Sequence, residues 1–410
     1  MKLLVRGAIL ASLLLPRGAR AEPSCNTITR DNVAPCAVSA SLPVRAAALS
    51  TIARRADAER ARVLLPSNPT LALSLAGRRS TGDSAFNAYG QLGQEIEIGG
   101  QRGARSREAE ARVLASEAQR GATARDVAAE ALTAYFEVLA AREETALLRR
   151  VEVLAIRVAD TARAQAKAGA VAEVDADVGE VQAAKRTQAR IVVEGRLAAA
   201  EVRLARLVGA SGSPAVDGTL RPLAVPSRNE TSPRIAALTK EAEALDAQAT
   251  VLARSRIPNV TVSVFAQSDG FRERVIGAGL ALPIPLPEPL GQSRSSEIAH
   301  ARAEAERTRT EAQGMRVALA READAFEAEA TALLHASTVV DDARAARVEA
   351  SLARLANEVE KGRLQARDAF VAQDALADLL VQRVASKRSA CVASVRLAAL
   401  RGIALERGNP

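Results

Sequence analysis

The chain has 410 residues, of which 2 % are aromatic and 25 % are charged, and its formal net charge is +8. With no Trp, two Tyr and six Phe, the chain has few of the large aromatic side chains that fill a conventional globular core. Its abundant Ala, Arg, Glu and Leu are typical of long helices and coiled coils. Acidic and basic residues are interspersed without a basic block, so the net charge does not indicate nucleic acid as a partner.

The first residues predict export. Residues 1–21 combine Lys2 and Arg6 with a following apolar run from Ala8 to Leu15 and a small-x-small motif ending at Ala21, which is the pattern of a signal peptide. In the N-terminal segment 22–43, Cys25 and Cys36 lie close together, and an oxidising compartment favours a disulfide between them. A lipid anchor on Cys25 is the alternative, although the residues before it make a poor lipid-attachment motif.

Residues 44–208 form the first of two predicted repeats. A helix from Val44 to Leu65 is followed by a β-hairpin, 70–98, in which leucines alternate with small or polar residues. A helix from about Arg102 to Lys167, free of Pro, is expected to reach about 100 Å at 1.5 Å per residue. Gly169 reverses the chain into a second helix from about Val174 to Leu207.

The same plan recurs after a linker, 209–232. The second repeat, 233–401, is expected to contain a helix from Pro233 to Ser255, a hairpin 260–282, a helix from about Gln292 to Lys361, a reversal near Gly362 and a helix from Arg367 to about Arg401. A short tail, 402–410, ends the chain.

Four strands per chain raise a packing problem. A two-stranded hairpin is marginal in water, and about eight strands are the minimum for a closed barrel. Several chains that each contribute four strands would pair every edge. Phe86, Tyr89, Phe265 and Phe271 lie in the hairpins, where interface girdles would sit. A soluble, elongated coiled-coil protein is the alternative interpretation.

Catalytic chemistry is not indicated. His300 and His335 lie inside long predicted helices and lack metal-ligand spacing, and no phosphate-binding loop or nucleophile motif is present. Cys391 lies on an apolar helical seam, which favours a buried structural role. The sequence therefore predicts neither an enzyme nor a metal or cofactor site.

From about Val44 to Arg401, the chain resembles the TolC-like outer-membrane efflux factor family. The residues that carry the resemblance are Asn68-Pro69, the segment from Gln94 to Gly103, the segment from Gly279 to Pro285, and the two reversals. Within that family, Ile96-Glu97-Ile98-Gly99-Gly100-Gln101-Arg102 looks most like the heavy-metal cation efflux, CzcC-like branch.

The resemblance implies a mainly α fold with a small β part. A homotrimer would form one twelve-stranded β-barrel in outer-membrane lipid, continued by a periplasmic α-helical barrel. It would act as the exit duct of a tripartite efflux system, with a periplasmic adaptor (membrane fusion protein) and an inner-membrane transporter of the RND type, exporting heavy-metal cations. The alternatives are a soluble periplasmic coiled-coil adaptor or scaffold, and the same duct serving drug efflux or type I protein secretion.

The resemblance also implies a periplasmic constriction beside each reversal. An Asp lies six residues after each reversal glycine: Asp175 after Gly169, and Asp368 after Gly362. Two basic residues near the second reversal, Arg363 and Arg367, could compensate the negative charge of crowded carboxylates. The family leads us to expect a second acidic residue three positions after Asp368, but this chain has Val371 there. The alternative is that Asp175 and Asp368 only cap helices.

Overall fold

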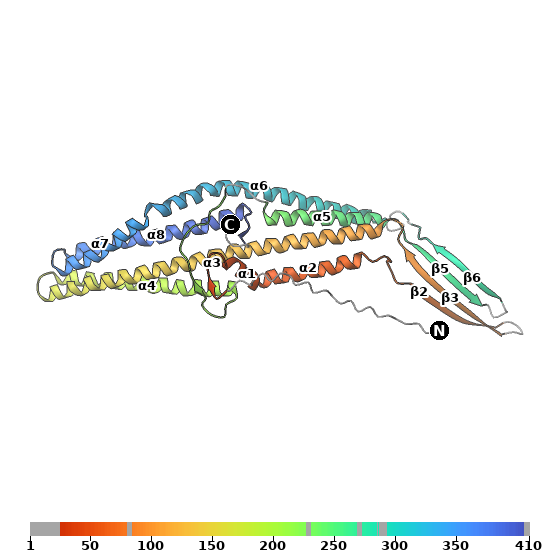
Figure 1. Cartoon of the computed structure of the whole chain (residues 1–410), viewed down its shortest axis with the longest axis horizontal. Helices are drawn as coiled ribbons and strands as arrows, with labels where there is room; N and C mark the ends of the chain where they lie inside the picture. The colour runs from red at the N-terminus through yellow and green to blue at the C-terminus, as the bar shows by residue number, and fades with distance from the viewer. Residues whose placement is uncertain are drawn as a thin grey trace.

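The computed structural model describes residues 25–79, 84–226, 231–268, 273–284, 286 and 293–405. The molecule is a long rod with a β-sheet at one end, two helix reversals at the other and long helices between them (Figure 1). The predicted signal peptide, Phe271 and the last five residues of the tail lie outside the described residues.

A helix that the sequence did not predict, α1 (Val33–Ala40), lies in the N-terminal segment. The predicted first helix of the first repeat is α2 (Leu42–Ala61), which begins two residues before the predicted Val44 and ends four residues before the predicted Leu65. Extended Ser41 separates them, and its side chain accepts a hydrogen bond from the Val44 backbone N–H at 3.4 Å, which starts a new helix. No single described helix is long and apolar enough to cross a membrane; α1 and α2, bent by 60°, meet the length and composition criterion only as a pair.

The long helical hairpin of the first repeat follows the prediction to within one residue at each end. It consists of α3 (Gln101–Lys167) and α4 (Glu173–Val208). Gly169 has φ +72°, a conformation that glycine adopts without strain, and it turns the chain between the helices.

The linker is more ordered than its composition indicated. It contains β4 (Ala215–Val216), which pairs in parallel with β1 (Thr27–Ile28) of the N-terminal segment. The Tyr135 hydroxyl donates to the Asp217 carbonyl at 2.8 Å, and burial raises the pKa of Tyr135 to about 12, so the hydroxyl stays protonated at neutral pH. Gly218 is required beside it, because an added Cβ would lie 2.1 Å from the Tyr135 hydroxyl oxygen.

The second repeat corrects one prediction. After α5 (Pro233–Arg254) and a hairpin, the helix expected from Gln292 to Lys361 is divided into α6 (Ser295–Val339) and α7 (Asp342–Glu360). The break has an N-cap, since the Asp341 side chain accepts from the Arg344 backbone N–H at 2.6 Å. The final helix, α8 (Ala366–Leu400), returns along the rod.

The two hairpins form one sheet. Its strands are β2 (Thr70–Arg79), β3 (Ser84–Ile96), β5 (Val260–Ser268) and β6 (Arg274–Ala281), antiparallel in the order β2-β3-β5-β6. The central pair β3–β5 joins the repeats, with Leu92 opposite Val264. Strands β2 and β6 therefore form the two edges of this sheet.

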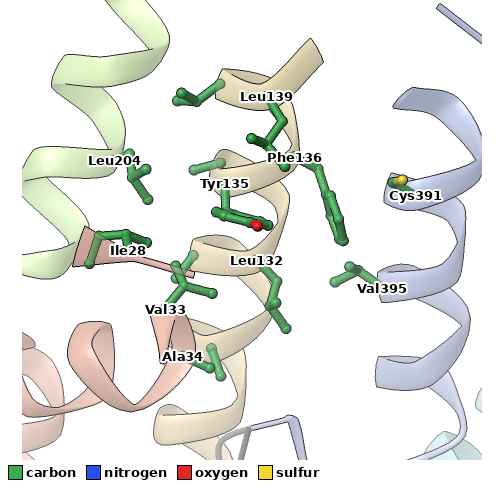
Figure 2. Close-up of a cluster of buried hydrophobic side chains, with 14 of the residues drawn as sticks. Ile28, Val33, Ala34, Leu132, Tyr135, Phe136, Leu139, Leu204, Cys391 and Val395 are labelled. Atoms are coloured by element: carbon green, nitrogen blue, oxygen red, sulfur yellow. The ribbon is translucent and has the colours of Figure 1, made fainter. Parts of the chain in front are cut away.

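The largest buried cluster lies in the middle of the rod, where α1, α3, α4 and α8 meet (Figure 2). Tyr135 and Phe136 supply its aromatic part, with ring centroids 5.4 Å apart. Cys25 and Cys36 are joined beside it, with Cα atoms 5.9 Å apart. Cys391 is buried as predicted, and burial raises the pKa of its thiol to about 12, which suppresses thiolate reactivity at neutral pH.

Candidate functional surfaces

One face of the sheet is apolar and exposed. Directly opposed residues in an antiparallel sheet share a face, so the row Leu71, Leu92, Val264 and Ala278 crosses all four strands on one side. The apolar residues of this face that are most exposed are Leu71 (67 %), Leu73 (74 %), Leu75 (69 %), Ile276 (85 %) and Leu280 (78 %). A continuous exposed apolar patch of this kind marks an interaction surface.

Apart from Phe265 and Val275, the other face is built from polar or small residues and Tyr89. Tyr89 and Phe265 lie on it, with ring centroids 6.1 Å apart, and the Tyr89 hydroxyl donates to the Gln91 amide oxygen at 2.7 Å. Gly277 makes room for the Phe265 ring, because an added Cβ would lie 2.5 Å from it. The sequence predicted that these aromatic residues would lie in an interface girdle. Tyr89 and Phe265 instead face away from the apolar side, and Phe86 lies on it.

The junction between sheet and helices contains a network that sequence reasoning missed. The side chain of buried Gln101 accepts from the Gly99 backbone N–H at 2.7 Å and donates to the Ile257 carbonyl at 2.7 Å. Asn259 in turn donates to Glu95 at 2.7 Å. The segment from Gln94 to Gly103 thus connects the first repeat to the second through hydrogen bonds. In the sequence, the polar residue Gln101 directly after Gly99-Gly100 was the feature that could have indicated this contact.

The two helix reversals pack against each other at the far end of the rod (Figure 1). Val158 and Ala162 of α3 form a buried cluster with Val359 of α7 and Phe370 of α8. Gly179 permits this packing, since an added Cβ would lie 3.2 Å from the Phe370 ring.

Both reversal acids occupy the same position in their helices. The residues in the N-cap positions are Ala172 and Gln365, so Asp175 and Asp368 are the third residues of α4 and α8. The alternative that the two acids are N-caps is therefore wrong. A carboxylate in the first turn is still favoured by the helix dipole, and the exposed Asp368 is also free to act at a surface.

The basic residues near the second reversal do not neutralise Asp368 within one chain. Arg363 lies 3.8 Å from Glu358 and is 70 % exposed. Within the part of the chain that the structure describes, Asp368 and Arg367 form no ion pair. The reversal end therefore presents a carboxylate and two guanidinium groups to its surroundings.

Residues 37–210 match the sequence model of a family described as outer membrane efflux protein. No curated protein matches the chain. Among solved structures, CusC superposes with a TM-score of 0.73 at 14 % identity over 91 % of each chain.

Two further structures have the same fold. The outer membrane protein VceC from Vibrio cholerae gives a TM-score of 0.70 at 17 % identity, covering 90 % of this chain and 95 % of its own. The CmeC outer membrane channel of Campylobacter jejuni gives 0.70 at 13 % identity, covering 90 % and 85 %. The match to the family model is confined to residues 37–210, whereas the likeness to these solved structures extends over about nine-tenths of the chain and shows a shared fold.

Proposed function

We propose that this chain is the outer-membrane exit duct of a tripartite efflux system and that it works as a homotrimer. The observation that carries the proposal is the sheet, which has one exposed apolar face, one polar face and two open edges at one end of a long helical rod. An edge strand with unsatisfied backbone groups cannot remain unpaired in lipid, so the sheet must close with other copies.

Three copies would supply twelve strands, enough for a barrel. The apolar face with Leu73 and Ile276 would then contact lipid, while the face with Tyr89 and Gln91 would line the lumen. Alternation of apolar and polar residues along each strand is the pattern of such barrels. Each β6 edge would pair with the β2 edge of the next copy.

The helices would continue the lumen through the periplasm. At 67 residues, α3 alone spans about 100 Å. The reversal end would meet a periplasmic adaptor that joins the duct to an inner-membrane transporter of the RND type. We place the constriction at this end, with Asp368 and its counterpart Asp175 at the mouth.

Detergent dependence separates this proposal from the alternative of a soluble adaptor or scaffold. A duct with a lipid-facing sheet should be extracted only by detergent and should conduct ions in planar bilayers, whereas an adaptor without an anchor stays soluble. Recovery of a monomer in detergent-free buffer, without channel activity, would contradict the proposal.

We propose that the substrates are heavy-metal cations. This proposal rests on the likeness of the segment around Gly99 to the CzcC-like branch. The contacts of that segment are internal, since Gln101 binds Gly99 and Ile257, so the pump and adaptor would set specificity. Identification of the co-purifying transporter tests this. A cation exporter supports it, and a drug exporter or a type I secretion transporter overturns the substrate alone.

A further inference from the structure

Charge on the apolar face of the sheet is confined to one end. Every second residue of each strand belongs to this face, and among the described residues of the four strands only Arg79 and Arg274 of this face are charged. Arg79 is the last residue of β2 and Arg274 is the first residue of β6, so both lie at the end of the sheet farthest from the helices (Figure 1). Both side chains are exposed, and they lie on the two edge strands.

The position of Arg79 matches the margin of a lipid-facing band. From Ile96 to Phe86, β3 rises about 33 Å at about 3.3 Å per residue, which is about 25 Å of height at a tilt of about 40°. The apolar band of outer-membrane barrels has about this height. Arg79 lies just beyond Phe86, because its partner in β3 is Ser84. A charged side chain on the lipid face is costly at the bilayer centre and is tolerated at this margin, where headgroups begin.

The tilt of the strands brings Arg274 to the same height as Arg79. Through the pairs of the sheet, Arg274 lies opposite Leu75 of β2, four residues before Arg79. Strands about 4.8 Å apart and tilted by about 40° are staggered by about one residue per strand, so the steps from β2 to β6 offset this difference. At the near end, β6 is shifted in the same sense, because Ala281 lies two residues beyond the level of Thr70.

In the proposed trimer, these two arginines come together from neighbouring copies. Each β6 edge pairs with the β2 edge of the next copy, and adjacent strands are about 4.8 Å apart. Arg274 of one copy and Arg79 of the next would then lie side by side on the lipid face. Like charges opposite each other destabilise a sheet. Neither arginine forms an ion pair with a described residue, and no acidic residue of the described strands lies on this face, so the compensating anion must come from outside the chain.

We propose that Arg79 of one copy and Arg274 of the next bind a phosphate of a lipid headgroup at the outer margin of the barrel. A guanidinium group presents paired N–H donors that match phosphate oxygens, and it stays charged at neutral pH. The apolar face below would contact the acyl chains of the same lipid, with Phe86, 60 % exposed, at the boundary. This inference rests on the proposed trimer and adds a ligand to its β6–β2 contact.

Native mass spectrometry of the full-length protein in detergent tests the site, with diphosphorylated lipid A as the probe. The trimer should bind this lipid, and Arg79→Gln combined with Arg274→Gln should weaken binding by about tenfold or more, because charged hydrogen bonds are lost. The matched control removes the same charge from exposed positions on the rod, Arg316→Gln with Arg347→Gln, and should bind like the unaltered protein. Arg79→Lys with Arg274→Lys keeps the charge without the paired donors and should bind with intermediate affinity.

Two further probes identify the ligand. Lipid A without its phosphates should bind the unaltered protein no better than it binds the double Gln variant, and inorganic phosphate at the same concentration should not displace the phosphorylated lipid. Equal binding of the lipid with and without phosphates would overturn the proposal. Displacement by inorganic phosphate would also overturn it, because the site would then bind the ion and not the lipid.

The outcomes separate this site from the proposed duct. A trimer whose double Gln variant binds the phosphorylated lipid as well as the charge-matched control overturns the site and leaves the duct intact. Absence of any trimer in the unaltered protein overturns both. In lipid-free detergent, the double Gln variant should form trimers at least as stable as those of the unaltered protein, because the contact between like charges is removed. A less stable trimer would contradict the placement of the two arginines side by side.

Discussion

Asp368 is the residue through which the reversal end would control passage. It is exposed in the first turn of α8 and forms no ion pair within the described part of its own chain. In a trimer, three such carboxylates would surround one mouth and attract cations. We expect Asp368→Asn to raise or alter single-channel conductance in planar bilayers and to weaken block by divalent cations, with no loss of trimer.

A carboxylate further along the same helix serves as the control. Asp378 is 70 % exposed and lies 3.5 Å from Arg186, so Asp378→Asn should leave conductance and cation block unchanged. If Asp368→Asn behaves like this control, Asp368 contributes only to the first helical turn, where the effect on stability is about 0.3–1 kcal/mol.

The link between Cys25 and Cys36 is a second prediction at the residue scale. These residues are 11 apart in sequence, and closing such a loop stabilises a fold by about 2–3 kcal/mol in the chain-entropy model. Peptide mapping of the exported protein without reductant should find the two cysteines joined. Free thiols at both positions, or a lipid on Cys25, would refute the prediction.

At the scale of elements, the junction between sheet and helices depends on Gly99. An added Cβ there would lie 2.7 Å from the Ile257 side chain, so Gly99→Ala should destabilise the protein by about 1–3 kcal/mol. Gly103 is the matched control: its added Cβ would meet only the end of Arg107 at 3.7 Å, and Gly103→Ala in a helix should be neutral or slightly stabilising. Thermal unfolding followed by circular dichroism compares them; equal losses would exclude the steric explanation.

The break between α6 and α7 depends on Arg383 of α8. This side chain, only 10 % exposed, donates to the Val340 carbonyl at 2.9 Å and binds Asp342. Arg383→Ala leaves that carbonyl without its charged donor, a loss of about 1.5–3 kcal/mol. Hydrogen exchange around residues 339–344 should therefore become faster. Arg388→Ala, an exposed position on the same helix, should have no such effect, and equal exchange in both variants would contradict this role.

The sequence predicted the elements whose signals are local and repeated. Period-two leucines predicted β2, and the long stretch without Pro up to Gly169 predicted α3. The break at Val340 could not be predicted in the same way, because it is completed by Arg383, 43 residues away. Strands β1 and β4 are each two residues long and lie far apart in the sequence, so no periodic pattern could predict that they pair.

The candidate site was predictable to a similar extent. The coincidence of glycine and aspartate identified both reversals, but the position of Asp368 within its helix depended on where the loop ended, which local patterns locate poorly. Alternation along each strand places Tyr89 on the same side as Gln91, and Phe265 on the same side as Thr261. That the two rings lie next to each other depends on the register between the hairpins, which only the folded sheet defines.

At the scale of the whole molecule, a single copy leaves part of its sheet exposed. The sheet has two edge strands, β2 and β6, and an exposed apolar face at one end of the rod. In the proposed ring of three copies, neighbouring copies would pair these edges, and lipid would cover the apolar face.

Mass measurement of the full-length protein in detergent, by light scattering or native mass spectrometry, tests the central claim most directly. The sheet of one copy has four strands, a closed membrane barrel needs at least about eight, and the proposed ring contains three copies. We predict a single species of three chains that forms ion-conducting channels when the same sample is added to planar bilayers. A stable monomer or dimer without conductance would contradict the account.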